Sequence, residues 1–237
     1  STLTNIFSKE FIIETCDGQK HFAQTFRNNM SERTKAKITN KKTAFTKITY
    51  LTDFKRFGLN GINKNHYLMI TKRLIDIAAC NPTLKIFLND KPIAFKTFKD
   101  YANRYVTPIF YDQSEHWKIG IGHSKTGFKA ISFVNSVETK DGGTHVNNID
   151  WQITSYLRDK IKRKYRVDVK PSELRQHLYL FINCTVINPS FSSQTKEKLI
   201  TPPKDFGTSH VLSEKVLRQV LNSEIIESVL DWINRKQ

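Results

Sequence analysis

The chain has 237 residues, 38% of them hydrophobic, which is enough to form one large or two small globular domains. Its 16 Phe, eight Tyr and three Trp exclude a disordered chain, and its apolar runs fall short of the roughly 20 residues of a membrane span. A formal net charge of +16 favours a polyanion such as nucleic acid as partner, although a generally basic proteome or a need for solubility would give the same balance.

Cysteine and histidine usage argues against a disulfide framework or a metal site. Cys16, Cys80 and Cys184 lie far apart among apolar neighbours, so we expect buried reduced thiols. No His-x-x-x-His or Cys-x-x-Cys pair occurs, and we expect no metal site. Charged residues interrupt the apolar runs at the start, unlike a signal peptide. We therefore expect an intracellular protein of the cytoplasm or nucleus, not a secreted one.

The first third of the chain predicts strands around a polar loop. Residues 10–27 predict two antiparallel strands, because Asp17 and Gly18 form an Asp-Gly hairpin signal. Residues 28–42 predict a polar, basic loop, and residues 43–51 a third strand. The cations of this loop lie beside Ser, Thr and Asn, which favours solvation or contact with a nucleic-acid backbone over base stacking. They are Arg33, Lys35, Lys37, Lys41 and Lys42.

The middle of the chain predicts two helices and a strand. Apolar residues recur every three or four positions over 66–79, which predicts a helix that the Asn-Pro pair at 81–82 ends. Residues 83–88 predict a strand, and residues 95–105 a short amphipathic helix. Pro108 and a polar turn within 106–114 suggest a boundary. We expect one domain over residues 1–110 and another over residues 111–237.

The second half alternates strands and helices, which indicates an α/β or α+β fold. Residues 117–122 and 128–137 predict strands, and a glycine pair at 142–143 precedes a helix over about 145–164. His145 is expected to pack or cap rather than act as a catalytic base, because no acid or nucleophile lies beside it in sequence. A buried strand follows over 177–187. The apolar stripe of the long helix is Val146, Ile149, Ile153, Leu157 and Ile161.

A cluster of cations lies at the end of the long helix and in the loop after it. Six positive charges fall within residues 160–170, more than the few tenths of a kcal/mol gained by each cation at a helix C-terminus would explain. Phosphates would relieve the repulsion between them and release counterions. We favour sequence-tolerant DNA contact over a solvated basic end. This basic cluster consists of Lys160, Lys162, Arg163, Lys164 and Arg166, with Lys170 nearby.

A polar segment over residues 188–199, called the lysine loop below, follows the strand at 177–187. Its Asn-Pro and Ser-Ser pairs end the strand and present Gln194 and Lys196 on a projecting turn. The amide of Gln194 can donate a hydrogen bond to a terminal phosphate oxygen, and the Lys196 ammonium can neutralise that oxygen. A solvated loop lysine is the alternative reading of the tripeptide alone.

The residues around Lys196 extend this pattern. They include Asn188, Pro189, Phe191, Ser193, Gln194, Thr195, Lys196 and Glu197. In this order they resemble the lysine loop in the transducer domain of type IIA DNA topoisomerases, whose pattern is Asn-Pro-x-Phe-x-Ser-Gln-Thr-Lys-Glu.

Further segments resemble the same family along nearly the whole chain, and several are similar to its eukaryotic and large-phage branch. The resemblance implies an α+β fold, in which the C-terminal half of a Bergerat-type GHKL ATPase sandwich is followed by a transducer domain. The transducer would contain a left-handed βαβ crossover, an exception to the usual right-handed rule. The segments are residues 3–8, 10–15, 133–136, 139–146, 203–207, 212–215 and 226–233.

The nucleotide pocket of this family needs motifs that do not occur in these residues. They are an asparagine helix for Mg²⁺, an Asp-x-Gly-x-Gly segment for adenine and a glycine lid for phosphates. Ser1 matches the position after the last lid glycine, and Thr2 falls where many relatives carry a phosphate-binding lysine. Thr46 matches the threonine that supports adenine binding through water, or is a plain strand residue. We expect the second half of an ATPase region, as a split subunit, a fragment or a chain lacking earlier residues, which binds ATP poorly alone.

The resemblance implies part of an ATP-dependent type II DNA topoisomerase that couples ATP binding and hydrolysis to capture and passage of a DNA duplex. Gln194 and Lys196 would sense the γ-phosphate, with ATP and Mg²⁺ as cofactors of the complete enzyme. The implied partners are double-stranded DNA, the remaining topoisomerase segments or subunits, and a second copy in a homodimer. One alternative is a non-enzymatic DNA-binding or adaptor module that keeps the transducer fold. Another is a mismatch-repair or chaperone ATPase, which the sequence around Lys196 disfavours.

Overall fold

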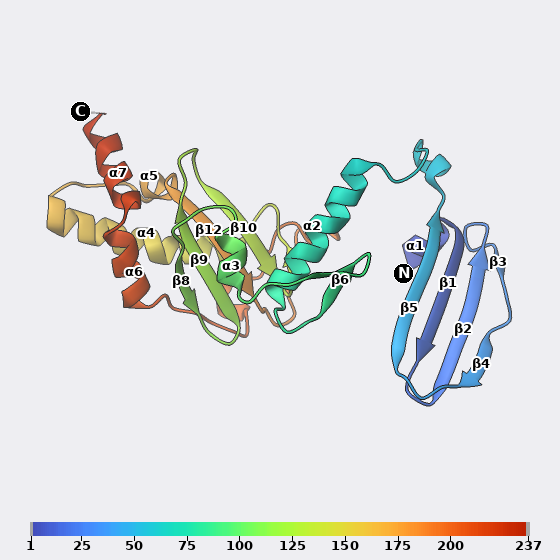
Figure 1. Ribbon diagram of the computed structural model, residues 1–237. Coiled ribbons are helices and arrows are strands. Elements are labelled where there is room, and N and C mark those ends of the chain that lie inside the picture. The colour runs from blue at the N-terminus through green and yellow to red at the C-terminus, as the bar shows by residue number, and fades with distance from the viewer. Residues whose placement is uncertain (1, 236–237) are drawn as a thin grey trace. The chain divides into compact units, whose positions relative to one another are not determined.

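The computed structural model describes residues 2–235, so the expectation for Ser1 lies outside the described residues. Contacts divide the chain into two compact units, Ser1–Tyr67 and Leu68–Gln237. Figure 1 labels the elements of both units, and we describe each unit by itself. The division between residues 67 and 68 concerns packing. The boundary between residues 110 and 111 concerns the domains of the resembling family and stays a prediction.

The first unit contains a five-stranded sheet. Its elements are α1 (Thr2–Ile6), β1 (Ser8–Cys16), β2 (Lys20–Arg27), β3 (Glu32–Arg33), β4 (Lys37–Asn40), β5 (Phe45–Thr52) and the 3₁₀ helix η1 (Phe54–Phe57). As predicted, β1 pairs antiparallel with β2. Strand β5, for which the sequence predicted no partner, pairs with the other side of β1. In the β1–β2 turn, Asp17 Oδ1 accepts hydrogen bonds at 2.8 Å from the backbone N–H groups of Lys20 and Gln19, which lower the pKa of this carboxyl.

The prediction of a loop over residues 28–42 is wrong in part. Both β3 and β4 pair antiparallel with β2. All six residues of these two short strands are exposed, so they lack the apolar alternation by which a strand is found in a sequence. Pairing at a sheet edge rests on backbone hydrogen bonds and tolerates polar and charged side chains.

The second unit is built around another five-stranded sheet. The elements after η1 are α2 (Lys64–Cys80), β6 (Ile86–Leu88), β7 (Lys91–Ile93), α3 (Phe98–Ala102), β8 (Phe110–Gln113), β9 (Trp117–His123), β10 (Lys129–Val134), β11 (Val137–Glu138), α4 (Thr144–Tyr165), α5 (Pro171–Arg175), β12 (Leu178–Cys184), the 3₁₀ helix η2 (Pro203–Asp205), α6 (Glu214–Leu221) and α7 (Glu224–Asn234). The strand order is β11-β10-β12-β9-β8, and β6 and β7 form a separate hairpin.

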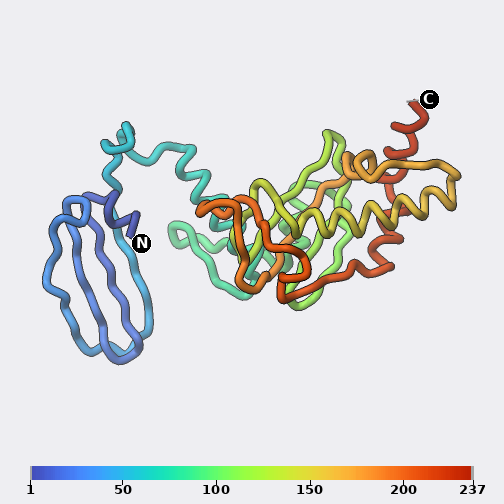
Figure 2. Tube along the Cα trace, turned by 180° about the vertical axis from the view of Figure 1, so that it is seen from behind, coloured from blue at the N-terminus to red at the C-terminus, as the bar shows by residue number. Residues whose placement is uncertain are grey.

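A βαβ crossover lies at the centre of this sheet. Strands β10 and β12 are parallel neighbours, whereas the other pairs are antiparallel. The chain between them passes through α4, which lies behind the sheet in Figure 1 and in front of it in Figure 2. In Figure 1 the chain runs down β10, returns behind the sheet and runs down β12 to the left of β10. This is the left-handed sense that the resemblance implied.

Helices cover both faces of the second sheet. On one face, the predicted stripe of α4, including Ile149, Ile153 and Leu157, is fully buried in a core with alternate residues of β12. On the other face, α3 and the end of α2 pack around Phe133 and Phe181. Each buried aliphatic or aromatic side chain contributes about 1.5–3 kcal/mol. Burial on both sides explains why β12 reads as a continuous apolar run.

Several boundaries in the second unit differ from prediction. The helices predicted over 66–79 and 145–164 are confirmed as α2 and α4. The strand predicted over 128–137 is divided by a turn at Asn135 and Ser136, whose φ angles are 51° and 63°. The helix predicted over 95–105 is shorter, because Thr97 caps its start in a reciprocal pair with Asp100 and Asn103 is already its C-cap. The segment 106–114, read as a polar turn, contains the edge strand β8.

Two further expectations concern cysteines and membrane spans. The three cysteines are free and buried, as predicted, and burial raises the pKa of Cys80 to about 12. Between residues 2 and 235, no helix is both long and apolar enough to cross a bilayer. The same residues contain no group of three or more His, Cys, Asp or Glu side chains suited to hold a metal ion.

Candidate functional site

The lysine loop lies in the second unit as an exposed turn closed by backbone pairing. Phe191 and Leu199 form an antiparallel bridge across its base. At the tip, the Lys196 N–H donates to the Ser193 carbonyl at 3.1 Å, and Lys196 takes a φ of 61°. A non-glycine residue seldom adopts this left-handed conformation, so the tip is a defined turn rather than an extended strand.

The side chains of the tip leave the Lys196 ammonium without a counter-ion. The Ser193 and Thr195 hydroxyls lie 2.7 Å apart, and the Thr195 hydroxyl donates to the Glu197 carboxylate at 3.1 Å. Among the described residues, the exposed side chains of Lys196 and Gln194 make no hydrogen bond or ion pair. The closest aromatic contact of Lys196 Nζ is the Phe191 ring, with 5.9 Å to the centroid. A cation and an amide donor therefore project together from one turn.

The base of the lysine loop is joined to the start of α4. The Leu199 N–H donates to the Gly142 carbonyl at 3.1 Å, and the Thr144 N–H donates to the Leu199 carbonyl at 3.1 Å. Gly143 has a φ of 136°, and a Cβ there would lie 2.3 Å from the Leu199 oxygen. Only glycine fits this approach. The sequence predicts the glycine turn but carries no signal that its partner is Leu199.

His145 supports this junction from inside. It is fully buried, and its Nε2 lies 3.1 Å from the Thr139 hydroxyl, which in turn lies 2.6 Å from the Ser132 hydroxyl. Burial lowers the pKa of His145 to about 3, so the ring is neutral near pH 7. The predicted packing role is confirmed. Capping is not its role, because Gly143 is the N-cap of α4.

The basic cluster lies at the opposite end of α4. The helix ends at Tyr165, and Arg166 closes it with a φ of 60° and an N–H bond to the Lys162 carbonyl at 3.2 Å. Lys160 is half-buried with Nζ 5.3 Å from the Tyr156 ring centroid, whereas Lys162, Arg163, Lys164 and Arg166 are exposed. Lys162 has one distant partner, Asp168 at 3.8 Å, with both side chains mostly exposed. Four solvent-facing cations therefore gather where the helix ends.

Thr46 lies on β5 in the first unit, not in the same unit as the lysine loop. It is exposed, and its hydroxyl lies 3.2 Å from the Thr15 hydroxyl on β1. This contact follows from the antiparallel register in which Thr15 and Thr46 are partners. The nucleotide-binding roles of Thr46, Gln194 and Lys196 stay predictions.

Comparison with known proteins identifies a set of relatives. The sequence profile described as DNA gyrase B matches residues 86–237. The mitochondrial DNA topoisomerase 2 of Dictyostelium discoideum is 40% identical over 264 residues, which cover 99% of this chain and 20% of that protein. This chain thus spans about a fifth of the length of that curated relative.

Solved structures of such proteins have the same α+β fold. The crystallised ATPase and transducer domains of DNA topoisomerase II from Balamuthia mandrillaris match with a TM-score of 0.94 and 38% identity, over 100% of this chain and 64% of that one. The ATPase region of Saccharomyces cerevisiae topoisomerase II matches with a TM-score of 0.89 and 32% identity, over 97% of this chain and 62% of that one.

Proposed function

Because this chain belongs to the DNA gyrase B family, with the ATPase regions of type II DNA topoisomerases among its relatives, we propose that it is the phosphate-sensing part of an ATP-dependent type II DNA topoisomerase. The complete enzyme would couple ATP binding and hydrolysis to the capture and passage of a DNA duplex. The observation that carries this proposal is the unpaired Lys196 ammonium on a loop hydrogen-bonded to the start of α4.

The exposed end of the lysine loop suits the terminal phosphate of ATP. ATP, bound with Mg²⁺, would present this terminal phosphate, which ADP lacks. Lys196 would neutralise one phosphate oxygen, and the Gln194 amide would donate to another. The fit rests on an exposed cation whose neighbouring carboxylate, Glu197, is engaged by Thr195. A loop that contacts only the terminal phosphate binds the ATP state more tightly than the ADP state, and only such a difference in affinity can shift a conformational equilibrium.

The basic cluster provides the corresponding surface for DNA. Exposed cations at the end of α4 would contact backbone phosphates of a duplex without reading its sequence. The helix joins this surface to the lysine loop as one continuous element. The remaining segments of the enzyme and a second copy of it would complete the dimer that encloses the captured duplex.

The proposal is tested by Lys196→Ala in the complete enzyme. Removal of one preorganised electrostatic contact to a reacting group typically lowers turnover by about 10²-fold. We expect ATP-driven strand passage to fall by that order, while ATP-independent DNA cleavage is retained. Lys198→Ala, which removes another exposed lysine of the same loop, is the matched control and should keep near-normal strand passage. Unchanged DNA relaxation in Lys196→Ala would refute the sensor role. A complete protein without ATPase activity would favour the adaptor alternative.

A further inference from the structure

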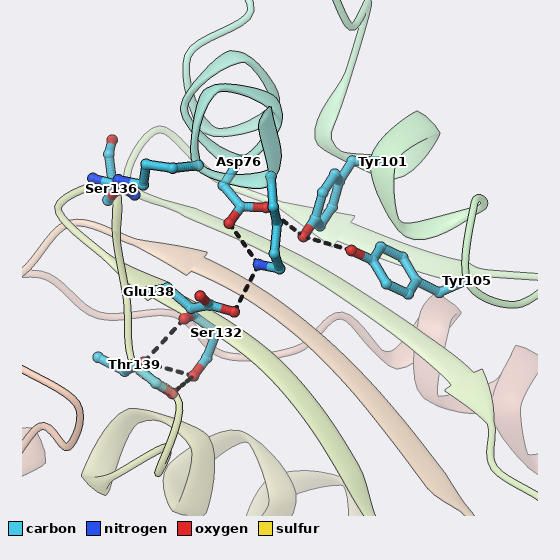
Figure 3. A network of polar contacts seen from close by, with 9 residues as sticks. Asp76, Tyr101, Tyr105, Ser132, Ser136, Glu138 and Thr139 are labelled. Carbon is cyan, nitrogen blue, oxygen red and sulfur yellow. Dashed lines mark hydrogen bonds and ion pairs between the residues drawn. The ribbon is translucent and has the colours of Figure 1, made fainter. Parts of the chain in front are cut away.

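A buried carboxylate on α2 anchors a polar network in the second unit. Asp76 is 1% exposed, and it accepts hydrogen bonds from Lys72 Nζ at 2.6 Å and from the Tyr101 hydroxyl at 2.9 Å. Figure 3 shows that the Tyr101 hydroxyl also contacts that of Tyr105, 3.1 Å away. Burial raises the pKa of Asp76, while the Lys72 ammonium acts in the opposite direction. The buried Asp76 carboxylate is stabilised by the Lys72 ammonium, and this ion pair holds the Lys72 side chain in place.

The same ammonium reaches across to the β10–β11 hairpin. Lys72 Nζ donates a second hydrogen bond to Glu138 Oε1 at 2.9 Å, from α2 to β11. Arg73 on α2 and Asn81, which directly follows the end of α2 at Cys80, hold the turn of this hairpin. Arg73 donates to the Ser136 carbonyl at 2.8 Å, and Asn81 donates to the Ser136 hydroxyl at 3.0 Å. Helix α2 and the residue after it thus contact the hairpin both at its turn and at β11.

The hairpin leads directly into the segment that holds the lysine loop. Thr139 follows Glu138 and is fixed on its inner side by the Ser132 hydroxyl (Figure 3). Asp141 then donates its N–H to the Glu197 carbonyl at 2.9 Å, next to Lys196. Hydrogen bonds from Leu199 to Gly142 and from Thr144 to Leu199 complete the junction. Glu138 is therefore the residue bonded to α2 that lies nearest in sequence to the segment 139–144, which joins the hairpin to the lysine loop.

We propose that Glu138, held by Lys72, is a positioning residue that sets the placement of the lysine loop. It touches no ligand and acts through the backbone of residues 139–143. The proposal rests on the proposed phosphate-sensing function, because placement matters only if Gln194 and Lys196 meet a ligand. It predicts that loss of the Lys72–Glu138 contact loosens the loop while the rest of the sheet stays intact.

The geometry favours changing Glu138 rather than Lys72. Substitution of Lys72 would leave the buried Asp76 carboxylate with Tyr101 as its remaining partner and would strain the core. Glu138→Met keeps a similar side-chain volume, removes the acceptor and leaves the Lys72–Asp76 pair in place. Glu138→Gln retains an acceptor oxygen for Lys72 and serves as the conservative rescue. Glu214→Met is the matched control, because it removes a 2.8 Å ion pair with Arg218 on α6.

The test measures backbone hydrogen exchange in the complete enzyme, together with ATPase kinetics. In Glu138→Met, amides of residues 139–144 and 190–200 should exchange at least about threefold faster, while those of β9 and β12 keep the wild-type rate. The kcat for ATP hydrolysis should fall several-fold with ADP affinity unchanged. Glu138→Gln should restore most of both properties, and Glu214→Met should change neither.

Two results would overturn the proposal. One is wild-type exchange of the loop amides in Glu138→Met. The other is an equal increase of exchange in β9 and β12, which indicates general loss of stability rather than positioning. Lys196→Ala measured in parallel separates this proposal from the sensor function. If Lys196→Ala retains strand passage, the sensor fails, whereas the exchange measurement still decides whether Glu138 places the loop.

Discussion

Replacement of Gly143 by alanine tests the junction between the lysine loop and α4. The residue has φ 136° and ψ −162°, a region that is essentially confined to glycine and costs other residues on the order of 1–3 kcal/mol. The new Cβ would also lie 2.3 Å from the Leu199 oxygen, 2.6 Å from its nitrogen and 2.9 Å from its Cα. These are backbone atoms, so no side chain can rotate away to relieve the overlap.

The magnitude follows from how the overlap is relieved. Separation of Leu199 from the turn breaks two hydrogen bonds, Leu199 N–H to Gly142 and Thr144 N–H to Leu199, each contributing about 1 kcal/mol. With the conformational cost, we expect Gly143→Ala to lower the free energy of unfolding by about 3–5 kcal/mol. Gly142→Ala is the matched control. Its φ of 65° costs roughly 1–2 kcal/mol, but the atoms nearest to its Cβ would be side-chain atoms of Val146 at 3.4 Å or more.

Urea unfolding followed by tryptophan fluorescence is the appropriate assay. All three tryptophans, Trp117, Trp151 and Trp232, belong to the second unit, so the signal reports the unit that contains the junction. The midpoint should fall much further in Gly143→Ala than in Gly142→Ala, with an unchanged slope m in both. In the complete enzyme, Gly143→Ala should also impair ATP-driven strand passage. A stability loss within about 1 kcal/mol of that of the control would refute the reasoning.

Two further predictions concern the basic cluster and His145. Neutralising Lys162, Arg163 and Lys164 together should reduce the slope of log affinity for DNA against log salt by about 2.7 if each contacts one phosphate; an unaltered slope would contradict the DNA assignment. Burial lowers the pKa of His145 from 6.5 to about 3, so the unfolded chain binds this proton first as the pH falls. The neutral buried ring contributes its full stability above pH 6.5, and this contribution is lost progressively as the pH falls towards 3. Between pH 7 and pH 5 the free energy of unfolding should therefore fall by about 2 kcal/mol from this group. The free energy of unfolding of His145→Met, measured with urea, should lack this part of the pH dependence. The same pH profile in the wild type and in His145→Met would refute the assignment to His145.

Local patterns predicted much of the fold, because they depend on neighbouring residues. The helical period around Ile153 located α4, and the Asp-Gly pair at Asp17 located the β1–β2 turn. The edge strands β3, β4 and β8 were missed, since their pairing is made by backbone groups and leaves little apolar pattern. The exposed placement of the lysine-loop tip followed from its polarity.

The supports of the candidate site could not be predicted in the same way. The approach of Gly143 to Leu199 and the bond from Lys72 to Glu138 join residues far apart in the chain. A single sequence shows which residue types are present, but it does not show which distant residue each of them contacts in the fold. Nothing in the sequence distinguishes Lys72 from other lysines on a helix surface, because the burial of Asp76 that fixes it depends on the packing of α2 against α3.

The length of α4 has a mechanical consequence. Its 22 residues make a rod about 33 Å long, with Gly143 before one end and the basic cluster at the other. If the pinned end acts as a pivot, a tilt of about 5° would carry the far end through about 3 Å, the length of one hydrogen bond. A displacement too small to disturb the core beneath the lysine loop would thus be amplified into one large enough to make or break contacts with a DNA phosphate.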